Sequence, residues 1–245
     1  ALLDCFLDNN EPLSLKEITQ RVGLPKSSVH SLLSTMRKQD IIMQNESNGK
    51  YSMGIHIFEL GNAVGKGLDI VKIAKPCMTA IADSINQTVH LTALRKNQAV
   101  LITRVDPAQN SFKMILAVGT AMPLYCTAPG KLFLAYMSES AASEYFHSTE
   151  MIGYTSNTIT DTGALLAHLK NIRTEGFAVE EGERNTGIHG VAAPIFNHQG
   201  KAAYAIGAFG LANSMKTLEF QFAKDKIIKA ASHISGQLGY RNSRP

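Results

Sequence analysis

Residues 14–38 read S-L-K-E-I-T-Q-R-V-G-L-P-K-S-S-V-H-S-L-L-S-T-M-R-K and predict two short helices joined by a tight turn. Ser14 is followed three residues later by Glu17, the pattern of a capping box, so the first helix should begin near Leu15. It should end just before Gly23, because glycine is the favoured residue immediately after a helix. A short helix with a defined start and stop is therefore expected near the beginning of the chain.

The second helix should have Pro25 at its first position, which that residue suits. Apolar residues then recur at spacings of three and four, which predicts one buried stripe made of Val29, Leu32, Leu33 and Met36. The opposite face carries small polar and basic side chains, namely Lys26, Ser27, Ser28, Ser31, Thr35, Arg37 and Lys38. A helix, a glycine-containing turn and a second helix together are typical of a helix-turn-helix.

This second helix has the composition of a DNA-reading element. Its first turn would reach base edges, where short Ser side chains can bond to bases or to phosphates. Residues 21–38 hold four basic side chains and no acid, a local charge of +4 that suits a phosphate backbone. The alternative is an αα-hairpin whose polar face is merely solvated.

A β-hairpin is predicted directly after this helix. Residues 41–44 and 50–53 read as strands, and the turn between them ends in Asn48-Gly49, a strong short-range hairpin signal. A hairpin in this place makes the motif a winged helix and favours DNA binding, whereas the alternative is a cap on a small core. The side chains expected to contact DNA are Ser14, Lys16, Lys26, Ser27, Ser28, His30, Ser31, Thr35, Arg37, Lys38 and Lys50.

Length and composition predict two folded domains. A chain of 245 residues with 44% hydrophobic and 18% charged residues is typical of a globular protein, and we expect domains at residues 1–66 and 67–245. No run of about 18 apolar residues predicts a membrane span. The three cysteines, odd in number and far apart, argue against a disulfide framework and a Cys-rich zinc site, and fit a reducing cytoplasm.

The second domain should be α+β. A linker helix at residues 54–66 should end the first domain, and the second should begin with a helix at residues 68–86, which Pro76 should kink or restart. The remaining segments predict antiparallel strands with helices flanking one side. The expected strands are residues 88–94, 99–105, 112–118, 177–183, 190–196 and 202–211, and the expected helices are residues 128–137, 138–146, 161–175 and 218–238.

Two motifs in this domain resemble the IclR family of bacterial transcriptional regulators. They are P-L-Y-C-T-A-P-G-K-L-F-L-A at residues 123–135 and G-F-A-V-E-E-G-E-R-N-T-G-I-H-G-V-A-A-P-I-F at residues 176–196. The resemblance covers essentially the whole chain and is greatest to regulators of sugar-acid catabolism. It implies a winged helix on a GAF-like ligand domain, a homodimer or homotetramer, double-stranded operator DNA as partner, and a small organic, sugar or aromatic acid as effector.

The resemblance also implies an effector site at Met122, Ala128, Pro129, Gly130, Glu180, Gly190, Gly207 and Phe209. Independently, residues 127–131 lead into a helix, whose free N–H groups favour a carboxylate, although this loop could merely turn the chain. Pro129 removes one such donor. Gly207 and Phe209 stand where relatives often carry hydroxyl groups, which predicts a less polar pocket with an aromatic face.

Metal binding and catalysis are not expected. His90, Cys126 and His189 match no metal-ligand spacing and no Cys-His pattern, so we expect no catalytic residue, metal or cofactor. The sequence therefore predicts an effector-responsive DNA-binding regulator that represses a catabolic operon. The alternatives are a small-molecule enzyme built on the second domain and a DNA-binding protein without an effector.

Overall fold

The two helices of the motif form where the sequence predicts them. The computed structural model describes residues 2–6, 11–67, 69–109, 116–215 and 217–241, and in it helix α1 spans Leu15–Val22. Ser14 Oγ accepts the Glu17 N–H at 3.3 Å, and the Glu17 carboxylate accepts the Ser14 N–H at 2.7 Å, which completes the capping box. Gly23 ends the helix with φ 69°, a left-handed conformation that glycine adopts without strain.

Helix α2 (Lys26–Arg37) departs from the prediction at two positions. Pro25 caps the helix from outside, so the helix begins one residue later than expected. Val29 and Leu33 are fully buried as predicted, but Leu32 is 43% exposed. Leu32 lies at the edge of the apolar stripe, beside the serines of the outer face, because consecutive helical residues are turned by about 100°.

A small core joins these helices to the predicted hairpin. Strands β1 (Ile42–Gln44) and β2 (Tyr51–Met53) pair antiparallel, and α3 (Ile55–Gly67) follows them. At the start of the chain a 3-10 turn, η1 (Leu3–Phe6), packs against this core. The buried core comprises Leu2, Phe6, Leu13, Ile18, Val29, Leu33, Ile42 and Tyr51.

The chain divides into two compact units, residues 1–68 and residues 69–245. The second begins with α4 (Asp69–Ile85), which continues through Pro76 instead of restarting there. Its sheet has six strands in the order β5-β4-β3-β8-β7-β6, all antiparallel neighbours. The strands are β3 (Thr88–Arg95), β4 (Gln98–Val105), β5 (Ala121–Pro123), β6 (Ala178–Glu181), β7 (Ile188–Phe196) and β8 (Ala202–Leu211).

The predicted strand at residues 112–118 is wrong over its last three residues. The expected strand at residues 112–118 lies outside the described residues up to residue 115, and residues 116–118 belong to no strand. The short edge strand β5 forms instead, a few residues further on. It pairs with β4 through Ala121, Met122 and Pro123, which brings Met122 to the sheet beside the start of the next helix.

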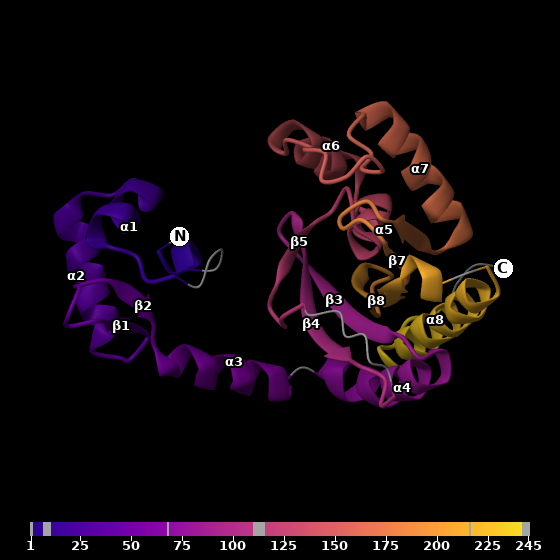
Figure 1. Cartoon of the computed structure of the whole chain (residues 1–245), viewed down its shortest axis with the longest axis horizontal. Coiled ribbons are helices and arrows are strands. Elements are labelled where there is room, and N and C mark those ends of the chain that lie inside the picture. The colour runs from indigo at the N-terminus through magenta and orange to yellow at the C-terminus, as the bar shows by residue number, and fades with distance from the viewer. Residues whose placement is uncertain (1, 7–10, 68, 110–115, 216, 242–245) are drawn as a thin grey trace. The chain divides into compact units, whose positions relative to one another are not determined.

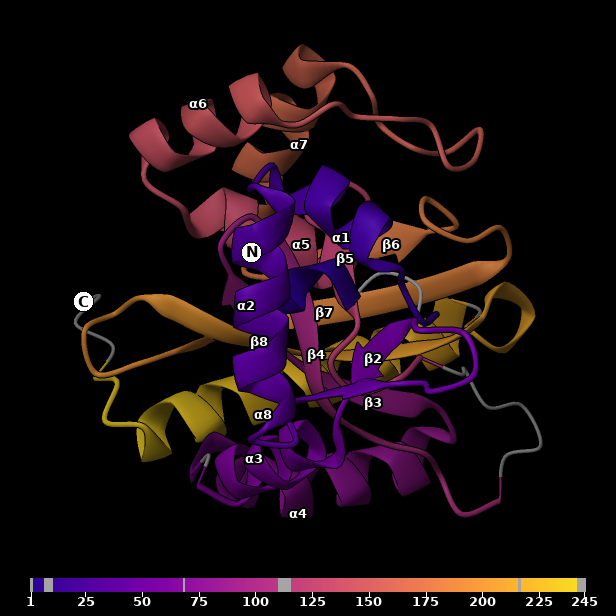
Figure 2. The same cartoon turned by 90° about the vertical axis from the view of Figure 1, so that its left-hand side faces the viewer.

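Helices cover both faces of this sheet, not one face as predicted (Figures 1 and 2). Helices α4 and α8 (Thr217–Gln237) pack together against β3 and β7, and α5 (Ala128–Tyr136) packs on the other face with α7 (Thr162–Glu175) and α6 (Glu139–Ser148) outside it. Strands β3 and β7 each contain an unbroken run of buried residues, which is the pattern of strands buried on both faces. Within the described residues, no helix combines the length and apolar character needed to cross a bilayer.

Candidate nucleic-acid interface and effector pocket

The predicted DNA-reading face of α2 is open to solvent. Lys26, Ser27, Ser28, His30 and Ser31 are all exposed, and the three serines surround a shallow hollow that Leu32 also lines. Small hydroxyl groups around an exposed apolar side chain suit the donor and acceptor pattern of a base edge together with a thymine methyl group. The serines are therefore placed where they could contact bases.

Three other predicted DNA contacts already have partners inside the unit. The Ser14 hydroxyl belongs to the capping box, and the Thr35 hydroxyl donates to the Ser31 carbonyl at 3.1 Å. Arg37 Nη1 donates to Gln44 Oε1 at 2.8 Å, and Gln44 Nε2 donates to the Gly49 carbonyl at 3.1 Å. Arg37 thus links the end of α2 to the β1–β2 hairpin, which is the wing of this winged helix. The remaining predicted cations, Lys16, Lys26, Lys38 and Lys50, are exposed.

A cavity of about 130 Å³ lies at one end of the second unit's sheet. Four residues of the predicted effector site line it: Met122, Pro129, Glu180 and Phe209. The predicted site lacks eight further lining residues, of which three adjoin predicted positions and five come from strand ends and loops far apart in sequence. They are His90, Leu116, Thr120, Ala121, Thr127, Arg184, Asn185 and Ile188.

The Phe209 ring forms part of the cavity wall, in agreement with the predicted aromatic face. Its ring lies 4.9 Å from the His90 ring, stacked on it. A Cβ atom built on Gly190 would fall 2.2 Å from the Phe209 ring, and one on Gly207 would fall 2.8 Å from it. Gly190 and Gly207 therefore leave room for the ring and present no side chain to a ligand.

The backbone N–H groups at the start of α5 already have hydrogen-bond acceptors, contrary to the prediction from sequence. Ala128 N–H donates to Glu180 Oε2 at 3.3 Å, Gly130 N–H donates to Thr127 Oγ1 at 3.2 Å, and Lys131 N–H donates to the Thr127 carbonyl at 2.8 Å. Pro129 has no N–H to donate. Every donor of residues 128–131, all of which the structure describes, is therefore occupied by a group of the chain itself. The prediction of free N–H groups at this helix start is wrong.

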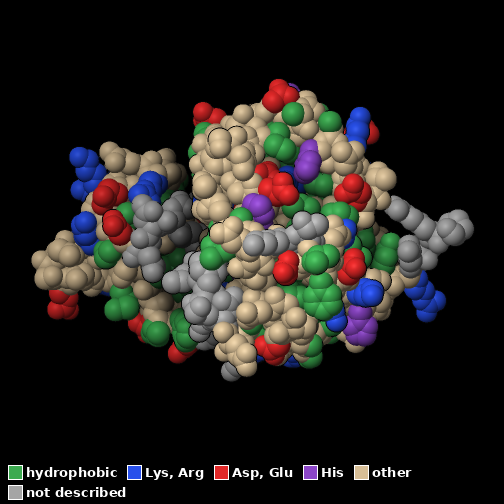
Figure 3. Space-filling model, turned by 45° about the vertical axis from the view of Figure 1, so that its right-hand side comes forward, with side chains coloured by type: hydrophobic (Ala, Val, Ile, Leu, Met, Phe, Trp, Pro, Cys, Tyr) green, Lys and Arg blue, Asp and Glu red, His purple; other side chains and the backbone are tan. Residues whose placement is uncertain are grey.

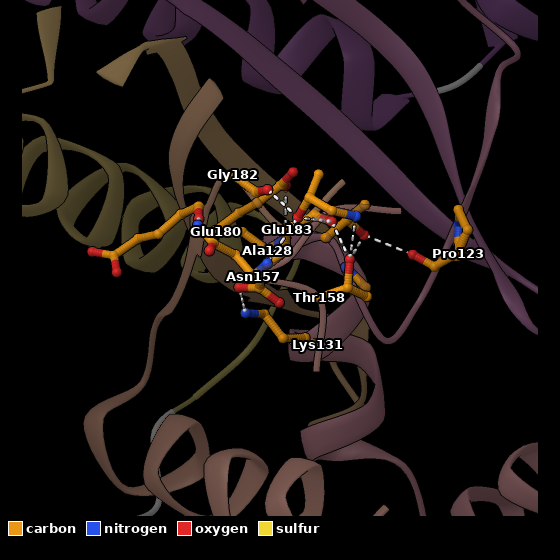
Figure 4. A network of polar contacts seen from close by, with 12 residues as sticks. Pro123, Ala128, Lys131, Asn157, Thr158, Glu180, Gly182 and Glu183 are labelled. Atoms are coloured by element: carbon orange, nitrogen blue, oxygen red, sulfur yellow. Dashed lines mark hydrogen bonds and ion pairs between the residues drawn. The ribbon is translucent and has the colours of Figure 1, made fainter. Parts of the chain in front are cut away.

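Glu180 is buried, with 4% of its surface exposed. Burial raises its carboxyl pKa to about 7, because desolvation disfavours the charged form and the Glu183 carboxylate adds to the shift, although the Ala128 N–H and Lys131 oppose it. A carboxyl group with this pKa exchanges its proton near neutral pH. Figure 4 shows Glu180 beside Ala128, next to the ion pair of Lys131 and Glu183.

The loop after β6, which includes Gly182 and Glu183, forms an ion pair with α5 and hydrogen bonds with residues 155–158. Lys131, which has no exposed surface, forms an ion pair with Glu183. Thr155 Oγ1 donates to the Gly182 carbonyl and Thr158 Oγ1 donates to the Glu183 carbonyl, each at 2.7 Å (Figure 4). These contacts hold the end of β6, and with it Glu180, at the cavity.

His90 is a cavity residue that sequence analysis had weighed only for metal binding or catalysis. It is 2% exposed, and its Nε2 has no hydrogen-bond partner in the described part of the chain. Burial, reinforced by Arg104, lowers its pKa to about 4, so the ring is neutral at physiological pH. Among the described residues, no group of three or more His, Cys, Asp or Glu side chains could hold a metal ion.

Cys126 lacks the setting of a nucleophile. Burial raises its thiol pKa to about 12, with the Glu180 carboxylate adding to the shift. A reactive cysteine needs the opposite shift, because the thiolate is the attacking species. This environment argues against an enzyme built on Cys126.

A larger hollow of about 380 Å³ lies elsewhere in the second unit, lined by aromatic residues including Tyr136, Phe196 and Tyr240. It contains no predicted site residue and no charged side chain, and Ser235 Oγ in its wall already bonds to Phe196 N and to the Ala231 carbonyl. Figure 3 shows acidic, basic and hydrophobic side chains interspersed on the visible face instead of gathered by kind. We therefore place the candidate effector site at the smaller cavity.

Comparisons with known proteins identify the family to which both units correspond. The family model described as "IclR helix-turn-helix domain" matches residues 1–46, and "Bacterial transcriptional regulator IclR C-terminal" matches residues 62–236. The chain is 31% identical to the HTH-type transcriptional regulator KipR of Bacillus subtilis over 98% of its own length and 95% of that protein. It is 30% identical to the regulator KdgR of Escherichia coli, with 96% and 89% covered.

Two further matches are informative. The Transcriptional repressor IclR of Escherichia coli is 26% identical, with 96% of this chain and 86% of that protein covered. A crystal structure of an IclR transcriptional regulator from Alicyclobacillus acidocaldarius is 26% identical and superposes with a TM-score of 0.85, covering 97% of this chain and 96% of that one.

Proposed function

The chain belongs to the IclR family of bacterial transcriptional regulators, and on that premise we propose that it represses a catabolic operon until a small acid binds its second domain. The family consists of regulators and not of enzymes. It joins a DNA-binding helix-turn-helix to an effector-binding domain. Relatives named as repressors support repression, and the resemblance to regulators of sugar-acid catabolism keeps sugar acids among the candidate effectors.

The observation that carries the DNA-binding proposal is the exposed outer face of α2. Ser27, Ser28 and Ser31 present hydroxyl groups there, and Lys26 adds a cation at the first helical position. Base edges carry the sequence information and phosphates fix the register, so the serines would select among operators and Lys26 would strengthen binding to all of them.

Operator binding of single variants tests this assignment. Ser27→Ala and Ser28→Ala should change the ranking of operator variants, whereas Lys26→Ala should weaken binding to every sequence alike. Ser140→Ala, an exposed serine on α6, is the matched control and should change neither. Serine variants that rank the operators as the unmodified protein does would refute this orientation of α2.

The wing should contribute less. Lys50 is the one cation of residues 41–53 in the printed sequence and is exposed, so Lys50→Ala should reduce the salt dependence of binding by about one unit at most. Arg37→Ala should also weaken binding to all sequences, partly because it releases Gln44 and so loosens the wing. An unchanged salt dependence in Lys50→Ala would place the wing away from phosphates.

We also propose a homodimer, or a homotetramer built from dimers, through α3. Its surface exposes large apolar side chains, with Phe58 66% and Ile55 62% exposed in the single chain. Paired half-sites on DNA require a matching two-fold protein, and an exposed apolar helix face provides an interface. Phe58→Glu should shift light scattering toward the monomer, and a monomeric unmodified protein at micromolar concentration would reject the proposal.

The effector should enter the cavity between Glu180 and Phe209. Its volume of about 130 Å³ is well below the roughly 300–1,000 Å³ of pockets for drug-sized ligands, so small organic acids fit best. Sugar acids and aromatic acids are larger, so their binding requires a wider cavity. A thermal-shift screen of all three classes identifies the effector, since a ligand that binds the folded state raises its stability by mass action.

The effector must then change the affinity for the operator by the same factor by which the operator changes the affinity for the effector. A ligand changes DNA affinity only through unequal affinity for the two DNA-binding states, and the coupling is reciprocal. Phe209→Ala should weaken effector binding and leave DNA affinity without effector nearly intact. Effector titrations into free protein and into the operator complex should differ by the same factor that the effector imposes on operator affinity. Equal effector affinities, with operator affinity changed, would show that the effect is not allosteric.

The effector-independent alternative predicts a different result. In that case binding would be salt-sensitive but indifferent to sequence, and no metabolite would alter it.

A further inference from the structure

The first turn of α5 can offer an N–H group to a ligand only if its present partner leaves. Thr127 occupies the donors of Gly130 and Lys131, and as the residue that caps this helix it cannot leave without unwinding the turn. Glu180 occupies the Ala128 donor, and it comes from strand β6, 52 residues away in sequence. The side chain of Glu180 is therefore the exchangeable partner.

We propose that Glu180 is an internal carboxylate that competes with the effector's carboxylate for the Ala128 N–H, so that an acid effector binds together with one proton taken up by Glu180. The inference rests on the function proposed above, in which the cavity takes a small acid. It adds that Glu180 sets both the strength and the pH dependence of that binding. The proton passes from solvent to a Glu180 oxygen, and no covalent bond to the effector forms or breaks.

The charges around Glu180 explain why its carboxylate and that of the effector cannot both be ionised in the cavity. Lys131 is the buried cation nearest to it, but Glu183 already pairs with Lys131. The other cation of the cavity wall, Arg184, stacks on the Tyr154 ring. A second carboxylate would therefore add negative charge to a buried site whose buried cation is already paired, and like charges in such a site push one group to its neutral form. The groups that face Glu180 from neighbouring elements are Lys131 on α5, Cys126 before it, Glu183 and Arg184 on the following loop, and His90 across the cavity.

Neither strand β7 nor His90 adds a charge beside Glu180, and the Arg184 side chain is engaged with an aromatic ring. Strand β7 places Gly190 opposite Glu180, so it contributes no side chain there, and His189 lies opposite Glu181 in the strand register. Arg184 lies with its guanidinium 4.0 Å from the centre of the Tyr154 ring, stacked on it. His90, with a pKa of about 4, stays neutral across the range in which Glu180 titrates.

The raised pKa of Glu180, about 7, sets the expected pH window. Below pH 7 the group is already protonated and an acid meets little competition. Above pH 7 each further pH unit should weaken acid binding about tenfold, because the proton must be taken from an increasingly alkaline solution. Between pH 6 and pH 8 the dissociation constant should therefore rise about tenfold.

Calorimetric titration of the full chain with lactate and lactamide tests the proposal. The two ligands have the same size and hydroxyl group, and both suit a small cavity, but only lactate carries a charge. Lactate should bind about tenfold more weakly at pH 8 than at pH 6, with nearly one proton taken up at pH 8 when two buffers of different ionisation enthalpy are compared. Lactamide should bind equally at both values.

Two matched variants isolate the residue. Glu180→Gln retains an acceptor for Ala128 but cannot titrate, so lactate should bind it equally at pH 6 and pH 8, and about tenfold more tightly than the unmodified protein at pH 8. Glu181→Gln removes the same charge from the next residue, whose side chain is exposed, and should behave like the unmodified protein. Unchanged melting curves confirm that both variants fold.

Each contrary result has a distinct meaning. Lactate binding that is independent of pH and takes up no proton overturns this inference and leaves the proposed function intact. Weaker binding to Glu180→Gln at both pH values overturns it as well, because Glu180 would then accept a hydroxyl group from the ligand. Failure of lactate to bind the unmodified protein or Glu180→Gln at either pH overturns the inference together with the small-acid class in the proposed function.

Discussion

Replacing Lys131 by Met should strongly destabilise the second unit. Lys131 has no exposed surface, and the Glu183 side chain that pairs with it is 8% exposed. Met keeps most of the apolar stem but removes the charge, which leaves a buried carboxylate without its cation. Breaking a buried pair in this way costs about 3–5 kcal/mol.

For a unit of this size, each kcal/mol corresponds to about 2–4 °C, so the transition should fall by about 6–20 °C. Six of the seven tyrosines lie in residues 69–245, and the chain contains no tryptophan. Tyrosine fluorescence during heating or urea titration therefore follows mainly the second unit. Effector and DNA are absent from this assay, so the result does not depend on the proposed function.

Two controls identify the cause. Lys72 pairs with Asp69 at 3.7 Å, but the two side chains are 66% and 83% exposed, so Lys72→Met should cost less than about 1 kcal/mol. Adding Glu183→Leu to Lys131→Met should restore much of the lost stability, because removing both charges of a buried pair is often nearly neutral. A Lys131→Met transition within about 2 °C of the unmodified protein, or a double variant no better than the single one, would refute the reasoning.

Gly190→Ala should cost about 1–3 kcal/mol in urea unfolding, because its Cβ would lie 2.2 Å from the Phe209 ring, whereas Gly236→Ala, in open space on α8, should stabilise by about 0.5–1 kcal/mol. Iodoacetamide at pH 8 should modify the two partly exposed cysteines before Cys126, whose pKa is about 12; mass spectrometry that finds Cys126 modified first would contradict this. Burial lowers the pKa of His90 to about 4 in the folded state, so between pH 6.5 and pH 4 the unfolded chain binds more protons than the folded one. The free energy of unfolding should therefore decrease as the pH is lowered through this range. His90→Asn should lose roughly 2 kcal/mol less than the unmodified protein between pH 7 and pH 4.5, and equal losses would reject this origin.

Local features of the fold could be predicted because neighbouring residues specify them. The capping box of Ser14 and Glu17 and the left-handed Gly23 bound α1, and the hairpin follows from the Asn48-Gly49 turn between two short strands. Most strands and helices of the second unit were likewise predicted from hydrophobic periodicity. The motifs at residues 123–135 and 176–196 identified the family, which the comparisons confirm.

The errors arose where packing between distant segments decides the outcome. Hydrophobic patterns in an antiparallel sheet did not reveal that helices cover both of its faces. A three-and-four spacing placed Leu32 in the core stripe of α2, although it is 43% exposed. The exposure of Leu32 has no signal in the adjacent residues, because it depends on which surfaces meet after the chain has folded.

For the candidate effector site, the sequence alone determined several of the residue types that the structure brings together. Met122, Pro129, Glu180 and Phe209 were predicted from the family resemblance, and all four line one cavity. Only the tertiary structure decided how they interact. The carboxylate of Glu180 reaches the N–H of Ala128, 52 residues away, and hydrogen bonding over such a separation depends on strand register and helix packing, not on any local pattern of residues.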